Sequence, residues 1–435
     1  MSDGFTSPRG TNDILPDDIF LWQDIEDRAR RLFRVYNYQE IRTPLFEETE
    51  LFARSMGQTS DVVQKQMLHL ASQKSEPAST STEVSFSLRP ENTASIARAY
   101  TQHALDKKRG LAKLYYLGAM FRGERPQKGR LRQFHQIGAE AIGPQSASPY
   151  LDAEMIALSL YLLKQFGIRE FQLKINTLGT AEDKERFSVK LRQQLKPYLT
   201  ELSEYSRARF ERNVFRILDS KEKADQEVMA RIRIDHSYLS DESRRYYEEV
   251  KKALDALNIE YMPTAHLVRG LDYYTHIVFE ITSASLGSQD ALGAGGRYNN
   301  LIQQLGGPSV DAIGFALGVE RIILALGADH VPEDMKKENH LEVFVIAMDE
   351  PCQRTAFHIL NELRQEGIIC DMDYRLASLK SQMRLANKFQ AKYTLILGSD
   401  ELKDNELTLK DMATGDQKRV PLSQISRALN NILKP

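Results

Sequence analysis

Residues 114–142, LYYLGAMFRGERPQKGRLRQFHQIGAEAI, predict an antiparallel hairpin of two apolar strands joined by a basic loop. Successive side chains of a strand point to opposite faces, so one face of this hairpin combines small, aromatic and polar residues. The residues of that face are Tyr116, Gly118 and Met120 on the first strand and Gln136, Gly138 and Glu140 on the second. The hairpin therefore offers a floor with an amide and a carboxylate around a glycine.

The loop of this hairpin is strongly basic. Between residues 122 and 132 it holds five Lys or Arg and one Glu, a local charge of +4 in a chain of net charge −2. Two interpretations are open: a solvated basic turn, or a phosphate site, since guanidinium groups bind phosphate bidentately. The solvated turn does not account for Gln136 and Glu140 on an otherwise apolar strand. A buried carboxylate is costly without a partner, so we expect a cationic or hydrogen-bonding ligand here.

Length and composition are those of an ordinary soluble globular protein. The 435 residues suffice for two or three domains, and the low net charge restricts nucleic-acid contacts to local patches. Cys352 and Cys370 lack metal-type spacing and predict small core residues in a reducing compartment. Residues 1–16 lack the apolar core of a secretory signal, and Glu320 and Arg321 interrupt the longest apolar run. We therefore expect a cytoplasmic protein without a membrane span.

The order of predicted elements indicates an α+β protein. Strands and helices without strict alternation, before residue 179 and again over 258–330, favour an antiparallel sheet flanked by helices. Residues 180–257 are charged, glycine-free and helical, which predicts an inserted helical domain, whereas 331–435 predict a separate α/β domain. The expected domains are thus 1–179, 180–257, 258–330 and 331–435. The absence of a Walker-type loop and of GxGxxG disfavours the usual nucleotide-binding folds.

Three arginines stand in apolar or glycine-rich surroundings. Arg122 follows LGAMF, Arg269 precedes Gly-Leu-Asp-Tyr-Tyr, and Arg321 begins an apolar helix. A single buried arginine is usually half of an ion pair, here with Glu124 or Glu320. Three of them in one sheet domain favour a bound polyanion. A triphosphate with Mg²⁺ suits them, because cations stabilise the charge that develops at an attacked phosphorus.

Two shorter segments also carry candidate site residues. In residues 88–93, LRPENT, a strand–turn–helix junction points Glu91 toward the end of the strand. The alternative is a capping turn with a solvated carboxylate. Residues 267–282 predict a strand on which Tyr273 and Tyr274 face opposite ways, one into the core and the other toward a cleft.

Two further segments predict local backbone features. The glycines at 293, 295 and 296 permit the close approach of a flat group, or they form a plain hairpin turn. The Ser/Thr-rich stretch 71–85 predicts a mobile loop.

Several of these segments resemble motifs of one enzyme class. FRGERPQKGRLRQFHQ resembles motif 2 of class II aminoacyl-tRNA synthetases, GFALGVERIILAL resembles motif 3, and the strand around Arg42-Thr43-Pro44 resembles motif 1. LVRGLDYY and GAGGRY are similar to the two signatures of histidyl-tRNA synthetases. With RGTNDILP near the start and the α/β tail, the resemblance to that family covers essentially the whole chain.

The resemblance implies activation of L-histidine by ATP with Mg²⁺, transfer to tRNA(His), a homodimer, an anticodon-binding tail and no protein-bound metal site. The implied catalytic residues are Arg122, Arg269 and Arg321. Residues implied to bind histidine are Glu91, Thr93, Arg122, Gln136, Glu140, Arg269, Tyr273, Tyr274 and Gly295. Residues implied to bind ATP are Arg122, Glu124, Arg130, Phe134 and Arg321. Residues implied to contact the acceptor end of tRNA are Gln127, Lys128 and Arg130.

The chain departs from the family pattern at a few positions. Asn92 stands where many relatives have glycine, and Asn299-Asn300 where many have Asp-Gly. The loop at 71–85 is also longer than usual. The main rival function is a regulatory paralogue that binds histidine or a partner enzyme without charging tRNA, and a second is a tRNA-sensing module. The first typically loses LVRGLDYY and the tail, and the second should lose its ATP-binding arginines, whereas this chain retains all of them.

Overall fold

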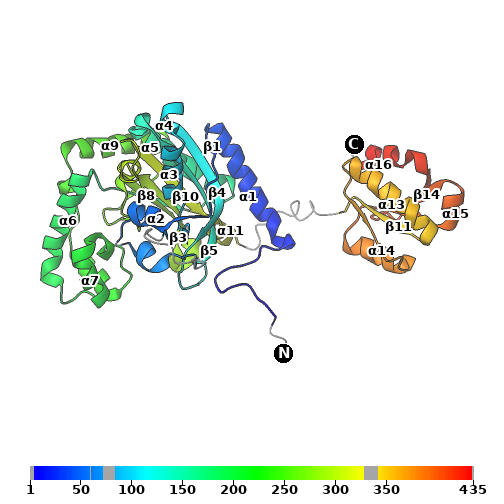
Figure 1. Cartoon of the computed structure of the whole chain (residues 1–435), viewed down its shortest axis with the longest axis horizontal. Coiled ribbons are helices and arrows are strands. Elements are labelled where there is room, and N and C mark those ends of the chain that lie inside the picture. The colour runs from blue at the N-terminus through cyan, green and yellow to red at the C-terminus, as the bar shows by residue number, and fades with distance from the viewer. Residues whose placement is uncertain (1–3, 59, 72–83, 328–340, 434–435) are drawn as a thin grey trace, which may run out of the picture. The chain divides into compact units, whose positions relative to one another are not determined.

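The computed structural model describes residues 4–58, 60–71, 84–327 and 341–433. The chain divides into two compact units, residues 1–330 and 331–435 (Figure 1). Most of the predicted mobile loop, residues 72–83, and the expected domain boundary at 330 and 331 lie outside the described residues. Among the described residues, no helix has the length and apolar character needed to cross a membrane.

The first unit is built on an eight-stranded sheet of order β1-β4-β5-β10-β9-β8-β6-β7. Its strands are β1 (Gln39–Glu40), β4 (Ala112–Phe121), β5 (Gln133–Ile142), β6 (Gln172–Thr177), β7 (Met262–Pro263), β8 (Thr275–Thr282), β9 (Ala291–Arg297) and β10 (Ala312–Gly318). All neighbours pair antiparallel except the two edge pairs, β1 with β4 and β6 with β7. The predicted α+β class is confirmed, although the strand around Arg42-Thr43-Pro44 is shorter than expected and ends at Glu40.

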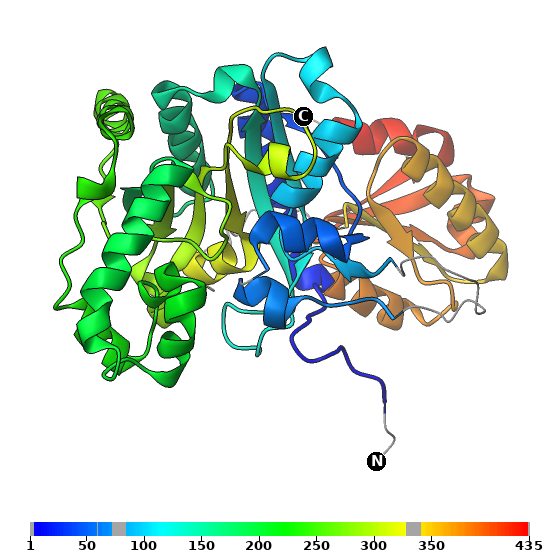
Figure 2. The same cartoon turned by 60° about the vertical axis from the view of Figure 1, so that its left-hand side comes forward.

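Helices cover both faces of this sheet (Figures 1 and 2). One face packs against α1 (Pro16–Val35), α5 (Pro149–Gln165) and α9 (Asp241–Ala256) through a continuous apolar core. The other face carries α2 (Thr49–Met56), α3 (Thr93–Gln102) and α10 (Leu301–Gln304) over a second core rich in tyrosine. Remaining short elements are β2 (Phe46–Glu48), β3 (Phe86–Leu88), α4 (Leu105–Lys108) and α11 (Val319–Leu326). The tyrosine-rich face is the one that bears the polar residues of the hairpin.

The β4–β5 hairpin has the register that its alternation predicts. Tyr116 pairs with Gly138, and Gly118 pairs with Gln136. A Cβ at Gly138 would lie 2.4 Å from the Tyr116 ring and 2.6 Å from the Phe315 carbonyl, so only glycine leaves room for this tyrosine. The space above Gly138 on this face of the hairpin is therefore filled by the ring of Tyr116 from the partner strand.

One predicted strand is wrong over half its length. The strand expected over 267–282 begins only at Thr275, and the preceding residues form turns and bends. The expectation that Tyr273 and Tyr274 lie on a strand and face opposite ways fails with it. Both tyrosines are buried in the same core, and their ring centroids are 4.7 Å apart.

The inserted segment has an apolar core of its own. Helices α6 (Ala181–Leu195), α7 (Glu204–Arg212) and α8 (Lys223–Met229), with short 3₁₀ turns between them, pack around residues such as Phe187. By contrast α9, expected in the same domain, packs with α5 against the main sheet. The boundaries 180–257 stay a proposal, and this packing favours an insertion that ends before α9.

The second unit follows the predicted alternation of strands and helices. Its sheet has the order β12-β11-β13-β14-β15, with strands β11 (Val343–Ala347), β12 (Cys370–Met372), β13 (Tyr393–Leu397), β14 (Glu406–Asp411) and β15 (Gln417–Pro421). Its helices are α13 (Glu350–Gln365), α14 (Leu379–Lys388), α15 (Ser399–Lys403) and α16 (Ile425–Leu433). Cys352 and Cys370 are free and buried in this unit, as predicted.

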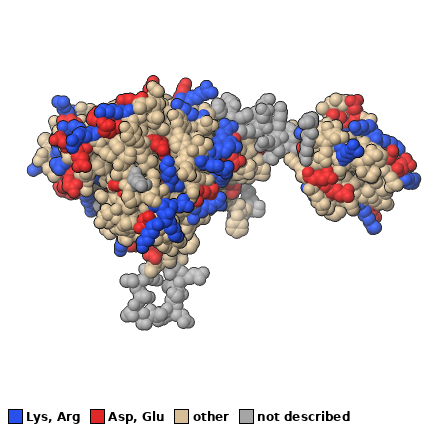
Figure 3. All heavy atoms as spheres, turned by 90° about the horizontal axis from the view of Figure 1, so that it is seen from above, with Lys and Arg blue, Asp and Glu red and all other residues tan. Residues whose placement is uncertain are grey.

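Acidic and basic side chains are interspersed over the visible face of each unit (Figure 3). This mixture agrees with the formal net charge of −2.

Candidate active site

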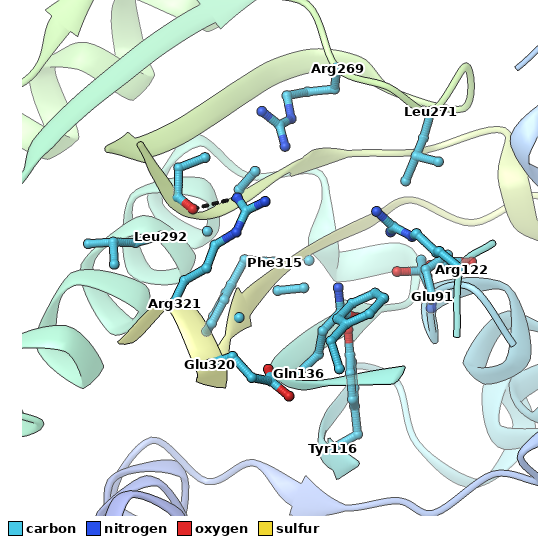
Figure 4. A pocket seen from close by; sticks show the side chains of 18 of the residues that line it. Glu91, Tyr116, Arg122, Gln136, Arg269, Leu271, Leu292, Phe315, Glu320 and Arg321 are labelled. Carbon is cyan, nitrogen blue, oxygen red and sulfur yellow. Dashed lines mark hydrogen bonds between the residues drawn. The ribbon is translucent and has the colours of Figure 1, made fainter. Parts of the chain in front are cut away.

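A cavity opens on the tyrosine-rich face of the main sheet and collects most of the predicted site residues (Figure 4). They come from β5 and the loop between β4 and β5, from the turn before α3 and its first residue, from the segment before β8, and from α11. The predicted residues that line this cavity are Glu91, Thr93, Arg122, Glu124, Arg130, Phe134, Gln136, Glu140, Arg269, Tyr273, Tyr274 and Arg321. Segments separated by up to about half the chain thus meet at one site.

One end of the cavity is cationic, with three arginines that reach toward the same space from different elements (Figure 4). Arg321 donates from Nε to the Gly129 carbonyl at 3.0 Å and from Nη1 to the Ala291 carbonyl at 2.7 Å. Burial lowers the pKa of Arg321, and the neighbouring guanidiniums of Arg130 and Arg122 lower it further. Because these cations repel one another, a polyanion at this end would relieve an unfavourable charge.

Arg122 follows β4 and is held in place by a contact that is not an ion pair. Its Nε donates to the Pro90 carbonyl at 2.9 Å, and its guanidinium lies 5.1 Å from the centroid of the Phe134 ring. Burial lowers its pKa, although Glu124 raises it. The carboxylate of Glu124 is 4.0 Å from Arg122 and 3.4 Å from Arg130. Arg122 therefore keeps donors that face the cavity.

The alternative ion pair of Arg321 with Glu320 is wrong. Both oxygens of Glu320 accept the His135 amide at 2.9 Å, and Oε1 also lies 2.9 Å from His135 Nδ1. Arg269 does have a carboxylate partner, since its Nη1 donates to Glu280 at 2.5 Å. The ion-pair reading thus applies fully to Arg269, weakly to Arg122 and not to Arg321.

The other end of the cavity is acidic and centres on Glu140. This buried carboxyl group accepts hydrogen bonds from Thr93 Oγ1 at 2.8 Å and from the Tyr298 hydroxyl at 2.5 Å. Burial raises its pKa to about 8, despite these two donors. A Cβ on Gly314 would lie 1.6 Å from Glu140 Oε2, so this carboxyl group requires glycine on the facing strand β10. Glu140 has hydrogen bonds here without a cation, as expected of a group that awaits a cationic ligand.

Glu91 caps the helix that follows it and is buried at the same time. Its carboxylate accepts the backbone amides of Thr93 at 2.7 Å and Ala94 at 2.9 Å at the start of α3. Such capping stabilises a helix N-terminus. The capping part of the alternative interpretation is therefore confirmed, whereas the solvated carboxylate is wrong, because Glu91 is only 4% exposed.

Polar atoms without partners also face the cavity. Among the described residues, neither the Tyr116 hydroxyl nor Gln136 Oε1 has a hydrogen-bond partner, although both atoms are buried. Buried polar groups are normally satisfied, and each exception needs an explanation. Here a bound ligand that offers donors and acceptors supplies one.

Four residues singled out in the sequence lie elsewhere. Gly295 is not among the lining residues, since a Cβ there would meet the Phe279 ring at 2.6 Å and the Gly314 carbonyl at 2.4 Å. Gln127 and Lys128 are exposed at the tip of the hairpin loop and outside the cavity. Asn92 is buried beside the site, where its Oδ1 accepts from Thr43 at 2.7 Å and from Arg89 at 3.1 Å. The structure therefore gives Gly295 a packing position and leaves its assigned role a prediction without geometric support.

Tyr298, Glu320 and Gly314 are among the lining residues that were not predicted as site residues. Tyr298 lies in GAGGRY and Glu320 lies in GVER, two segments that the sequence analysis singled out. Both residues could therefore have been predicted from these motifs. Gly314 lies within β10 and begins the GFALGVERIILAL segment, but its role depends on Glu140 of strand β5, which the local sequence does not show.

The antiparallel sheet, the hairpin arginine and the arginine of the strand–helix β10–α11 together define a class II aminoacyl-tRNA synthetase. The family model described as histidyl-tRNA synthetase matches residues 10–322, and the model described as anticodon binding domain matches 342–432. The chain belongs to the histidyl-tRNA synthetase family.

Curated relatives and a solved structure agree with this assignment. A histidine–tRNA ligase of Halothermothrix orenii is 42% identical over 98% of this chain and 99% of its own. Histidine–tRNA ligase 1 of Shouchella clausii is 42% identical over 98% of each chain. The crystal structure of apo S. aureus histidyl-tRNA synthetase has a TM-score of 0.77 and 35% identity, and it covers 98% of this chain and 100% of that one.

Proposed function

We propose that the protein is a histidine–tRNA ligase that forms histidyl-adenylate from L-histidine and ATP and then esterifies tRNA(His). The observation that carries this proposal is a single cavity with a cationic end and an acidic end, in a chain of this family. ATP brings a polyanion and histidine brings a cation, so the two ends suit the two substrates.

In the first step a carboxylate oxygen of histidine attacks the α-phosphorus of ATP, and the bond from this phosphorus to the bridging oxygen of pyrophosphate breaks. The second step passes the histidyl group to a hydroxyl at the 3′ end of tRNA and releases AMP. In-line displacement at phosphorus depends chiefly on positioning and charge stabilisation. Arg122 would hold the α-phosphate and the amino-acid carboxylate, and Arg321 would hold the γ-phosphate. Arg269 would stabilise the charge that develops at the α-phosphate. Preorganised cations in a partly buried site are most effective when charge develops there.

The acidic end would recognise histidine itself. Glu91, Thr93, Gln136 and Glu140 present acceptors and donors for the α-amino group and the imidazole ring. Tyr273 and Tyr274 bound the pocket, and burial raises the pKa of Tyr274 to about 12, so its hydroxyl stays a neutral donor. Gly295 is not among the residues that line the cavity, so we propose no contact between it and the substrate.

Mg²⁺ would bind with ATP and not as a resident ion. Mg²⁺ is usually held by one or two carboxylates together with substrate phosphates. Glu124 lines the cationic end beside Arg122 and Arg130, so its carboxylate oxygens fit such a donor set. When bound, the ion would neutralise charge on the phosphates, and Glu124 would orient it.

The remaining roles concern tRNA and assembly. Gln127, Lys128 and Arg130 on the hairpin loop would contact the acceptor end, and the second unit would bind the anticodon. We further propose a cytoplasmic homodimer, since β1 is an edge strand of the sheet in the segment that resembles motif 1. Light scattering at micromolar concentration tests the assembly, and a monomer would contradict it.

ATP–pyrophosphate exchange, run with each amino acid separately and without tRNA, tests the activation step. Exchange with histidine alone is the expected result. A folded protein that binds histidine and yet shows no exchange with any amino acid would favour the regulatory paralogue instead.

A further inference from the structure

The segment from Arg269 to Tyr274 carries three predicted site residues and yet has no regular secondary structure. It consists of bends and turns that lead into β8. The Asp272 amide donates to the Met56 carbonyl at the end of α2, over a long 3.4 Å. The Arg269–Glu280 ion pair also holds the segment to the sheet. Its backbone carbonyls still need hydrogen-bond partners, because buried backbone groups without partners are costly.

The support comes from side chains of the helical insertion. Lys184 on α6 donates from Nζ to the carbonyls of Asp272 and Tyr274, both at 2.9 Å. Burial lowers the pKa of this lysine, as expected of a cation held against a protein interior. Asn213, between α7 and the next 3₁₀ turn, donates from Nδ2 to Asp272 Oδ1 at 3.0 Å. Two residues of the insertion thus fix both the backbone and a side chain of the segment.

A third donor reaches the beginning of the segment. Arg216 lies in the 3₁₀ turn Val214–Ile217, is only 6% exposed, and donates from Nη2 to the Gly270 carbonyl. A Cβ on Gly270 would lie 3.3 Å from Arg216 Nη1, so glycine permits this close approach. The insertion therefore donates to three alternate carbonyls of the segment, at positions 270, 272 and 274.

Tyr273 lies between these anchors and the active site. It lines the active-site cavity on one side. On the other side it lines a second cavity whose walls include Lys184 and Asn213. The ring of Tyr273 packs against Tyr274 and Tyr298, and its backbone is placed by the hydrogen bonds that fix its neighbours Asp272 and Tyr274.

We propose that the helical insertion is a positioning element for the histidine-binding wall, with Lys184, Asn213 and Arg216 as its anchors. None of the three lines the active-site cavity, so they act through the segment and not on the substrate. This inference rests on the proposed function, because it concerns the same histidine subsite. If the proposal holds, the insertion contributes to histidine binding and is not merely a separate module packed against the catalytic sheet.

The variant Lys184→Met, assayed by ATP–pyrophosphate exchange on the full chain, tests the proposal. The two carbonyls lose a charged donor, so the KM for histidine should rise about tenfold. The KM for ATP should stay within about twofold, because the contacts of Arg122 and Arg321 do not involve the insertion. The milder variant Asn213→Ala loses one neutral donor and should raise the KM for histidine about threefold.

Lys190→Met is the matched control on the same helix. Among the described residues, Lys190 bonds to Asp235 at 2.6 Å and to Ser237, both within the insertion and neither in the segment. The KM of Lys190→Met for histidine should match the KM of the unaltered enzyme. An equal rise in this control would overturn the proposal, because it would trace the effect to general loosening of the insertion.

Other outcomes separate this proposal from the proposed function. An unaltered enzyme without exchange activity would refute the proposed function, and histidine titration calorimetry on the same variants would then decide the anchoring question. Active variants at Lys184 and Asn213 with an unchanged KM for histidine would refute the anchoring alone. If Lys184→Met does not fold, the KM of Asn213→Ala for histidine decides whether the anchors position the segment.

Discussion

Two arginines of the same sheet unit, the buried Arg297 and the half-buried Arg321, differ in what faces them. Arg297 at the end of β9 is 1% exposed, and Asp152 of α5 accepts from its Nε at 2.9 Å and from its Nη2 at 2.5 Å. Its Nη2 also donates to the Ser146 carbonyl. Arg321 on α11 donates only to the carbonyls of Gly129 and Ala291 in the contacts described above. The first charge is neutralised within the fold, and the second remains available to a ligand.

The pKa directions of the two arginines follow this difference. Burial lowers the pKa of Arg297, but the adjacent Asp152 carboxylate outweighs it and raises the pKa above its ordinary value. Burial lowers the pKa of Arg321, and like charges nearby add to the effect. A buried arginine is thus evidence for an anion-binding site only where the fold supplies no carboxylate to pair with it. With a carboxylate partner, the arginine is half of a structural ion pair.

The two carboxylates differ in their partners. Asp152 has a guanidinium partner, whereas Glu140 has two hydroxyl donors. Burial raises the pKa of both, and that of Glu140 reaches about 8. Paired groups hold helix α5 against the sheet, and unpaired ones stand where the substrates are expected. Each prediction below changes one member of this comparison.

The largest expected effect on stability is that of Arg297→Met. Asp152 would stay buried without its guanidinium, which typically costs about 3–5 kcal/mol. The single tryptophan, Trp22, packs edge-on against His135 in the first unit, so its fluorescence during urea unfolding reports this unit alone. A loss below about 1 kcal/mol would show that the pair is not structural.

Arg321→Ala should change activity strongly and stability little, in contrast to Arg297→Met. Loss of one preorganised cation should lower kcat of exchange by about 10²–10³-fold. Unfolding of the first unit should shift by no more than about 1 kcal/mol, because two neutral carbonyls lose a donor and a mutually repelling charge is removed. If this variant is as unstable as Arg297→Met with normal kcat, the distinction between paired and unpaired arginines collapses.

The sequence predicted those parts of the molecule that local pattern controls. The hairpin, its register and the junction of β10 with α11 follow from alternation and from glycine positions within a few residues. The alternation of strands and helices in the second unit was predictable for the same reason. The three cavity arginines were found because their immediate neighbours are apolar.

The rest depended on contacts between distant residues. Asp152 and Arg297 are 145 residues apart in sequence, and neither was singled out. The segment before β8, residues 267–274, was predicted as part of a strand because many of its residues are apolar. Its true shape depends on donors from the insertion, such as Lys184, which lies 88 residues from Asp272. Gly295 was assigned to the site from the resemblance of GAGGRY to a family signature, and the sequence does not show that this position faces Phe279.

Glu140→Gln sharpens the comparison between carboxylates through its pH dependence. The folded pKa of about 8 exceeds the ordinary value of 4.5, so the folded state binds more protons than the unfolded state between these values. Stability of the unaltered enzyme should therefore fall as pH rises from 5 to 8, by at most about 1.4 kcal/mol per pH unit from this group.

The difference between Glu140→Gln and the unaltered enzyme isolates this contribution. Glu91, Tyr116, Tyr274 and Tyr298 also face Glu140, and they remain in both proteins. Urea unfolding followed by Trp22 should show the variant gaining relative stability as pH rises. A difference that does not change with pH would mean that Glu140 is ionised throughout.

The smallest effect is expected at an exposed cation, Lys128 at the tip of the hairpin loop. An exposed lysine is neither stabilised by a partner nor destabilised by burial, so Lys128→Ala should leave unfolding and ATP–pyrophosphate exchange unchanged. Loss of one phosphate contact should raise the KM for tRNA about threefold and reduce the salt dependence of aminoacylation by about one counter-ion. Lys107→Ala, another exposed lysine of the same unit, is the control. Equal effects of the two would assign tRNA attraction to the general field of the protein, whereas an effect at Lys128 alone would place the acceptor end on this loop.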